Sequence, residues 1–324
     1  MGLSIVSARL ANTGLVALVA VDVVLVGLAL RSNHNPGIDT SPVSSAAASI
    51  DSAGATQSPS STPSAASPTS ATGAESTAPV APAPLQTMLV AIDNERAWRV
   101  GVGSCSAGGA TLATTTDGGT SWADAKAPLR TIVRMRPTDG RSAFVIGADS
   151  GCEAELKSTT NGGGTWGSTS DVGSAWYRDP RNPKVVGAPG PSTSQPCGGR
   201  AVLDLAVLSP DSARVLCADG LVRSTTNVGL SWTSSGTATG AVALAVSLAN
   251  PAQTYVALLN AADCAGVQVR RVGQSEATSC IATAVPQEPG QIALSLVRGG
   301  GWLTVGDATL RSTDELVTWR VSSG

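Results

Sequence analysis

The 324-residue chain contains a single histidine, His34, and no CxxC pair of cysteines. His34 lies in a stretch rich in Ser, Thr, Ala and Pro, so Ser–His or Cys–His pairs and histidine zinc sites are excluded from the rest of the chain. P-loop and HExxH patterns are also missing. These absences remove several large enzyme classes, and they predict neither a metal nor a cofactor.

Charge is scarce as well. Charged residues make up 14% of the chain and the formal net charge is −2. Proteins that bind nucleic acids carry a concentrated basic face, and no such concentration is present. The composition therefore predicts no nucleic-acid partner. Arginine far outnumbers lysine, and Ala, Gly and Val dominate, which is typical of a GC-rich bacterial genome.

The longest apolar run covers residues 10–30 and contains one charged residue, Asp22. At 1.5 Å per residue, a helix of this length crosses a hydrocarbon core of about 30 Å. We expect a transmembrane helix or signal anchor, with residues 1–9 as a cytoplasmic tail. A cleavable signal peptide is the alternative, although no small-x-small cleavage site precedes Arg31. The prediction is a single-pass cell-membrane protein whose remainder lies outside the cytoplasm.

Residues 31–85 consist mainly of Ser, Thr, Ala, Pro and Gly. Such a composition cannot bury enough apolar surface to fold, so this segment is predicted to be a disordered linker. As a flexible coil it would span on the order of 40 Å, and more if proline extends it. We interpret it as a stalk between the membrane and a folded domain at 86–324.

Within 86–324, a tryptophan closes a short motif four times. The motifs are TTDGGTSW ending at Trp122, TTNGGGTW at Trp166, TTNVGLSW at Trp232 and STDELVTW at Trp319. Self-similarity with a period near 40 residues indicates units that bury their core only against neighbouring copies. The motifs therefore predict a repeat architecture.

Each repeat reads as four strands. A strand carrying Trp98, Phe144, Val215, Tyr255 or Trp302 recurs ahead of the motifs, and a sixth copy occurs at Val185. Alternating apolar segments followed by turns precede these strands. Radial repetition of such sheets protects strand edges, as in propellers. The sequence predicts an all-β, six-bladed β-propeller, with five or seven blades as alternatives.

The motif has a structural explanation. Its Asp or Asn is expected to accept hydrogen bonds from backbone N–H groups two residues on, and its glycine to supply the positive φ of a turn. Because Asn replaces Asp in two copies, the position needs an acceptor and not a charge, which argues against catalysis or calcium binding. The tryptophan is expected to cover the hairpin. The structural set is Asp117, Gly119, Trp122, Asn161, Gly163, Trp166, Asn227, Gly229, Trp232, Asp314 and Trp319.

These motifs resemble those of the Asp-box, or BNR, repeat propellers found in sialidases, in the luminal domain of sortilin and in photosystem II assembly factors. Three motifs match well, whereas the fourth has Leu316 where glycine is expected and the fifth unit has lost the motif. The resemblance implies that the box lies on the outer hairpin of each blade, away from the functional face. It therefore implies a fold more than an activity.

All six cysteines lie beyond the predicted stalk, and an even number outside the membrane favours disulfides over metal binding. Six cysteines allow 15 connectivities. From repeat position we predict sequential pairing: Cys105 with Cys152, Cys197 with Cys217, and Cys264 with Cys280.

The ligand-binding candidates are Trp176, Tyr177, Arg178 and Arg134. The two aromatics are unexplained by the repeat and stand together in a unit without a box, and Trp, Tyr and Arg are enriched at binding hot spots. The favoured alternative is that Trp176 fills the gap left by the missing box tryptophan, with Tyr177 at the rim. A Pro/Gly/Ser loop follows at 187–199 and is of a length often associated with function.

The expected function is non-catalytic binding or scaffolding at the cell envelope, with a protein or a glycan as partner. The alternative is a sialidase-like glycoside hydrolase, for which the resemblance implies an arginine cluster, a tyrosine nucleophile and a carboxylic acid. The chain offers Arg134, Arg136, Arg178 and Arg298, the tyrosines Tyr177 and Tyr255, and the acids Asp93, Glu95, Asp139 and Asp179. The Arg-Ile-Pro motif that typically opens a sialidase domain is missing.

Overall fold

The computed structural model describes residues 81–190, 192–247, 252–286 and 288–323. The predicted cytoplasmic tail at 1–9, the membrane segment at 10–30 and nearly all of the linker lie outside these residues. Among the residues described, no helix is long and apolar enough to cross a membrane.

The described chain forms six antiparallel sheets, which we number as blades 1 to 6 in chain order. Blades 1 to 3 contain β1 (Thr87–Ala91), β2 (Ala97–Gly101), β3 (Thr111–Thr115) and β4 (Ala123–Ala125); β5 (Thr131–Pro137), β6 (Ala143–Ala148) and β7 (Glu155–Thr159); and β8 (Tyr177–Arg178), β9 (Val186–Gly187) and β10 (Thr193–Ser194). Blades 4 to 6 contain β11 (Val202–Val207), β12 (Ala213–Cys217), β13 (Leu221–Thr225) and β14 (Thr233–Thr237); β15 (Ala241–Ser247), β16 (Gln253–Leu259), β17 (Val267–Arg271) and β18 (Ser279–Ile281); and β19 (Ile292–Val297), β20 (Gly300–Val305), β21 (Ala308–Ser312) and β22 (Arg320–Ser323). The chain is a six-bladed β-propeller.

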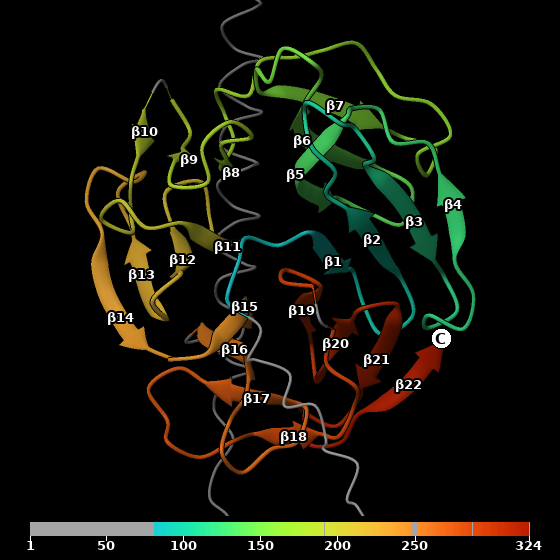
Figure 1. The fold of residues 1–324 in the computed structure, drawn as a ribbon. Helices are drawn as coiled ribbons and strands as arrows, with labels where there is room; N and C mark the ends of the chain where they lie inside the picture. Colours follow the sequence, from blue (N-terminus) through green and yellow to red (C-terminus); the bar gives the residue numbers. More distant parts are fainter. Residues whose placement is uncertain (1–80, 191, 248–251, 287, 324) are drawn as a thin grey trace, which may run out of the picture. The chain divides into compact units, whose positions relative to one another are not determined.

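The first strand of every blade lies innermost, so that β1, β5, β8, β11, β15 and β19 surround the centre (Figure 1). Consecutive strands of a blade then pair outward in chain order. Each blade is one uninterrupted segment, and β1 of blade 1 lies beside β19 of blade 6. The described ring therefore closes by contacts between whole blades, without an exchanged strand.

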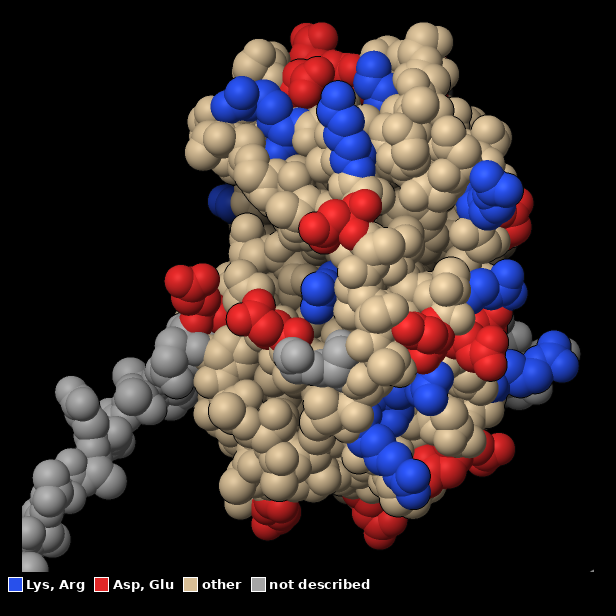
Figure 2. Space-filling model, turned by 90° about the vertical axis from the view of Figure 1, so that its right-hand side faces the viewer, with Lys and Arg blue, Asp and Glu red and all other residues tan. Residues whose placement is uncertain are grey.

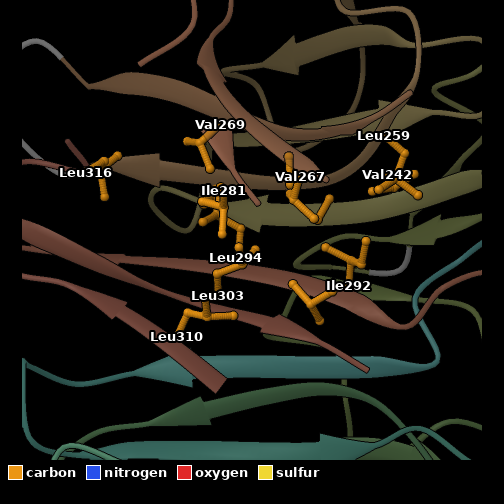
Figure 3. Packing of buried hydrophobic residues seen from close by; sticks show 14 of the residues in the cluster. Val242, Leu259, Val267, Val269, Ile281, Ile292, Leu294, Leu303, Leu310 and Leu316 are labelled. Atoms are coloured by element: carbon orange, nitrogen blue, oxygen red, sulfur yellow. The ribbon is translucent and has the colours of Figure 1, made fainter. Parts of the chain in front are cut away.

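The core lies between neighbouring blades, because each sheet buries its faces against the next one. The largest cluster of buried apolar side chains joins blades 5 and 6 (Figure 3). Val267 and Val269 of β17 and Ile281 of β18 face Leu294 of β19 and Leu303 of β20 in this cluster. Leu85, which precedes β1, is also buried there, so the folded unit includes this residue.

All four tryptophan-closed motifs fold alike, between the third strand of a blade and the segment that follows it. In blade 1, Thr115 Oγ1 donates to Asp117 Oδ1 at 2.8 Å and accepts the Gly119 N–H at 3.0 Å. The Ser121 N–H donates to Asp117 Oδ1 at 3.0 Å. The prediction that the acceptor binds an N–H two residues on is therefore wrong in detail. The loop is wide enough that the bonded N–H lies four residues on.

Asn and Asp make the same backbone bonds, which confirms that the position needs an acceptor. Asn161 Oδ1 accepts the Thr165 N–H at 2.9 Å, as Asp117 does for Ser121. Only the hydroxyl bond reverses: Asn161 Nδ2 donates to Thr165 Oγ1, whereas Ser121 Oγ donates to Asp117 Oδ2. In the aspartate copies these bonds lower the pKa of the carboxyl to about 2.

Glycine supplies the turn as predicted, with φ of 84° at Gly119, 85° at Gly163 and 77° at Gly229. Leu316 takes the same conformation with φ of 71° in blade 6, although a branched side chain rarely adopts it. Its side chain is 4% exposed and belongs to the apolar cluster between blades 5 and 6. Burial of this side chain offsets the backbone strain, which explains why glycine is replaced here.

The motif tryptophans join neighbouring blades and do not simply cover their own hairpins. Trp232 of blade 4 donates from Nε1 to Ser194 Oγ of blade 3 at 3.1 Å, and Trp319 of blade 6 donates to Ser279 Oγ of blade 5 at 2.9 Å. Trp166 similarly donates to the Lys126 carbonyl at 2.8 Å. These three motifs are therefore hydrogen-bonded to the preceding blade, whereas Trp122 has no partner for Nε1 among the described residues and packs its ring edge-on against Trp302 of blade 6.

Blades 2 and 3 depart from the predicted four strands. Blade 2 has three strands and a single bridge between Leu156 and Ser170 in place of the fourth. Blade 3 has three strands of two residues each. The segment after β7 is rich in Gly, Ser and Thr, and that of blade 3 is rich in Gly, Pro and Ser. Gly and Pro do not favour extended ladders.

Two of the three predicted disulfides are present. Cys197 is bonded to Cys217, and Cys264 is bonded to Cys280. Cys105 and Cys152 carry free thiols, so their predicted bond is not formed in this structure.

Candidate functional site

A cavity of about 650 Å³ occupies the centre of the ring. Its wall comes from the inner strands β1, β5, β11, β15 and β19, and much of it is aliphatic, with side chains such as Leu89, Leu205 and Leu294. The lining begins at Leu85, which precedes β1. It extends to Ile92 and Pro210, which lie in the turns after β1 and β11. The cavity therefore has the size and composition of a ligand pocket.

Two of the charged residues in this wall follow β-bulges of the inner strands. The pairing of β5 with β6 shifts between Ile132 and Arg134, and that of β11 with β12 shifts between Val202 and Asp204. A bulge adds one residue and redirects the side chains after it. This local irregularity explains how charged residues from apolar strands line the cavity.

Asp204 is a buried carboxylate of the wall. Its Oδ1 accepts the Leu205 N–H at 2.7 Å and its Oδ2 accepts the Leu244 N–H at 2.8 Å. Burial raises the pKa of Asp204, while these backbone bonds and the Arg178 charge oppose the rise. Because both oxygens already hold backbone N–H groups of two blades, Asp204 acts as a structural acceptor between blades 4 and 5.

Arg178 lies beside Asp204 and is 6% exposed. Its Nη1 donates to the Leu203 carbonyl at 3.2 Å, and the side chain lines the cavity. The same carbonyl accepts the Leu85 N–H at 3.1 Å, so Arg178 and Leu85 meet at one end of the cavity. A guanidinium has five N–H donors. Most of the hydrogen-bonding capacity of Arg178 thus remains available to a molecule inside.

Arg134 and Arg136 bring two more cations to the wall. Arg134 is half-buried, donates to the Trp176 carbonyl, and has its guanidinium 5.5 Å from the ring centre of Phe144. Burial and the neighbouring Arg136 lower the pKa of Arg134 to about 10. This value is still well above neutrality, so Arg134 is charged at pH 7. Three arginines and one carboxylate therefore line the cavity, and this excess of positive charge favours anions.

Trp176 does not lie in this cavity, and the structure corrects its interpretation as a surface hot spot. Its side chain is 1% exposed, and Nε1 donates to the Pro210 carbonyl of blade 4 at 2.8 Å. The ring packs edge-on against Trp232, with centroids 6.0 Å apart, and touches Gly229. Trp302 makes the matching contacts with Asp93 and Gly119 of blade 1. Trp176 therefore fastens blade 3 to blade 4.

Tyr177 is half-buried and also lies outside the cavity wall. Its ring covers Gly187 on the paired strand, where a Cβ atom would lie 2.3 Å from the ring. Burial, and then the Asp179 charge, raise the pKa of the Tyr177 hydroxyl. Of the four predicted binding residues, the structure brings together only Arg134 and Arg178 at the cavity.

Of the residues named for a glycosidase, Arg134, Arg136 and Arg178 line the cavity, but the acids and tyrosines do not join them there. Asp93, Asp139 and Asp179 each accept two backbone N–H groups of their own turn. Tyr255 donates its hydroxyl to Gln253 Oε1 at 2.9 Å. None of these four residues lines the central cavity in the described part of the chain.

Sequence reasoning missed Asp204. The signal was present, because Asp204 is the one charged residue in the apolar strand VLDLAVL. A charge in such a strand indicates a buried partner or a site.

The surface charges do not gather into a patch on the face shown in Figure 2, where basic and acidic side chains are interspersed. Among the described residues, no group of three or more His, Cys, Asp or Glu side chains is arranged to hold a metal ion.

No family model and no curated protein matches the chain. Solved structures that do match include YCF48 bound to a D1 peptide, with 16% identity, 76% of this chain and 87% of that chain covered, and a TM-score of 0.29. The SapL1 lectin in complex with α-methyl fucoside has 10% identity, coverage of 74% and 95%, and a TM-score of 0.42. The GH74 xyloglucanase from Xanthomonas campestris has 14% identity, coverage of 72% and 37%, and a TM-score of 0.29. Likeness at these identities concerns the fold alone and assigns no role to any residue.

Proposed function

We propose that this chain is a non-catalytic binding propeller of the cell envelope, which holds an acidic group of a protein or glycan partner in its central cavity. The observation that carries the proposal is Arg178, a buried guanidinium that lines the cavity and, within the described part of the chain, makes one hydrogen bond, to the Leu203 carbonyl. A buried cation with unused donors favours a bound anion, because burial strengthens the electrostatic attraction. The apolar run at 10–30 supports a membrane tether.

The aliphatic wall limits what enters with the anion. Leu89, Leu205 and Leu294 favour an apolar neighbour next to the acidic group. Arg134 and Arg136 extend the positive charge along β5. An extended acidic segment with apolar neighbours, such as a stretch of a partner protein, matches this wall in charge and hydropathy.

The proposal is tested by calorimetric titration of the full chain with a peptide of alternating Glu and Leu, and with its Gln and Leu counterpart. The acidic peptide is expected to bind, and the neutral one to bind at least tenfold more weakly. Trigalacturonate, an acidic sugar, distinguishes a glycan partner from a protein partner. Equal binding of the acidic and neutral peptides would contradict the proposal.

Two arginine variants provide the matched comparison. Arg134→Met is expected to weaken acidic-peptide binding about 10- to 100-fold, because a charge-assisted hydrogen bond contributes about 1.5–3 kcal/mol. Arg181→Met changes an exposed arginine outside the cavity and is expected to leave binding unchanged. Turnover of a fluorogenic sialoside that disappears in Tyr177→Phe would instead support the glycosidase alternative.

A further inference from the structure

Two free thiols meet on the described part of the ring where three blades come together. Cys105 lies in the loop between β2 and β3 of blade 1, and Cys152 lies in the loop between β6 and β7 of blade 2. The Cys105 thiol faces that of Cys152 and donates to the Pro180 carbonyl of blade 3 at 3.7 Å. The loops of blades 1, 2 and 3 therefore converge on one sulfur pair.

Both cysteines are held in place by their loops. Arg130 Nε donates to the Cys105 carbonyl at 2.8 Å, and its Nη2 donates to the Ser106 carbonyl at 2.6 Å. Cys152 has a left-handed φ of 57°, and its N–H donates to the Asp149 carbonyl at 2.9 Å. Because the loops already fix the two thiols near each other, joining them costs little further ordering.

The two thiols differ in their access to solvent. Cys105 is 6% exposed, whereas Cys152 is partly open to solvent. Burial, the facing Cys152 thiol and the Asp179 carboxylate together raise the pKa of the Cys105 thiol to about 11. The Arg130 guanidinium contacts the backbone carbonyl of Cys105 and not its thiol. Because the thiolate is the nucleophile, Cys105 reacts slowly at neutral pH.

We propose that Cys152 is a site of thiol–disulfide exchange and that Cys105 resolves the resulting mixed disulfide into a bridge between blades 1 and 2. The co-reactant is an external disulfide. The Cys152 thiolate attacks one of its sulfurs, so a mixed disulfide forms and one thiolate leaves. Cys105 then loses its proton to solvent and attacks the Cys152 sulfur. The mixed bond breaks, the second external thiol is released, and two electrons pass from the cysteines to the external disulfide.

Closure of this bridge changes how the blades are joined. The existing Cys197–Cys217 bond joins the segment after blade 3 to blade 4, and Cys264–Cys280 lies within blade 5. A third bond would join blades 1 and 2, and Cys105 would lose the S–H group that it donates to Pro180. The turn of blade 3 would then lose this contact with blade 1.

The test uses the full chain, oxidised glutathione as the external disulfide, acid quenching, alkylation and peptide mass spectrometry. The glutathione adduct is expected on Cys152 first and is then replaced by the Cys105–Cys152 bond. Its disappearance should accelerate about tenfold per pH unit from neutrality toward pH 9, because the Cys105 thiolate fraction rises by that factor. An adduct on Cys105 first, no adduct at all, or a closing rate independent of pH would overturn the proposal.

Single variants separate the two roles. Cys105→Ser should trap the adduct on Cys152, and Cys152→Ser should leave Cys105 unmodified, because Cys105 is buried. Thermal melting shows whether each variant is folded, and Cys105→Ala provides a second substitution should the buried serine prevent folding. Loss of the adduct in a folded Cys105 variant would contradict the order of steps.

Discussion

Replacement of Trp176 by alanine should remove most of the stability of the ring. The side chain is 1% exposed, and truncation of a buried tryptophan costs about 3–5 kcal/mol. The Pro210 carbonyl, which accepts its Nε1–H at 2.8 Å, loses that partner, which adds about 1–3 kcal/mol if the carbonyl stays dry. Domains are stable by about 5–15 kcal/mol, so Trp176→Ala should be close to unfolding.

Trp176→Phe keeps much of the packing against Trp232 and loses only the N–H donor and part of the ring. It should cost about 2–3 kcal/mol. Trp302→Phe provides a matched variant, because Trp302 makes the corresponding bond to the Asp93 carbonyl at 2.9 Å. The two phenylalanine variants are expected to agree within about 1 kcal/mol.

The measurement is urea unfolding followed by far-UV circular dichroism, compared with Leu230→Ala. Leu230 follows Gly229 in the blade 4 motif and is 79% exposed. Its truncation should change the free energy of unfolding by less than about 0.5 kcal/mol. A loss below about 1 kcal/mol in Trp176→Ala, with unchanged spectra, would refute the role of Trp176 between blades 3 and 4. It would also restore Trp176 as a binding candidate.

Three further predictions concern the motifs and the closure of the ring. Hydrogen bonds lower the pKa of Asp117 and Asp314 to about 2, against about 3.9 in the unfolded chain. The two carboxylates therefore contribute to the free energy of unfolding above pH 4, and this contribution is lost as the pH falls from about 4 to 2. Between pH 7 and pH 3, the melting temperature of the double variant Asp117→Asn with Asp314→Asn should therefore fall by less than that of the wild type. An equal fall would contradict this. Gly119→Ala places a Cβ 2.7 Å from a serine oxygen of blade 6 and should lower the melting temperature more than Gly109→Ala, where φ is also positive but the space is open. Arg311→Ala removes a hydrogen bond from blade 6 to the Asn94 carbonyl of blade 1 and a cation–π contact with Trp302 within blade 6. It should cost about 1–3 kcal/mol in urea unfolding, and no change would show that other contacts close the ring.

The number of blades could be predicted because each blade is encoded by one continuous segment of the sequence. The motif at Trp122 and its copies fix the third and fourth strands, and second-strand residues such as Trp98 and Trp302 fix the period. All of this information lies within about 40 residues, so pattern and turn chemistry suffice.

The candidate site was only partly predictable, because it depends on contacts between blades. Arg134 and Arg178 were named, but the bulges that redirect Arg134 and Asp204 cannot be seen in the alternation of residues. The sequence left open whether Trp176 binds a ligand or fills a gap, because the carbonyl that accepts its N–H belongs to Pro210, which lies 34 residues further along the chain. Such pairings become visible only when neighbouring blades are placed side by side.

The uninterrupted construction of every blade has a consequence for the order of the chain. No strand of the described ring is shared between the two ends, so the junction of blades 6 and 1 is held by side-chain and backbone contacts of the same kind as the other junctions. The point at which the chain starts can therefore be moved to another blade without changing the order of the blades around the ring. A circular permutant that starts at blade 4, with a flexible linker from β22 to β1, should form the same ring with its cavity, and its ends would leave the ring on a different side.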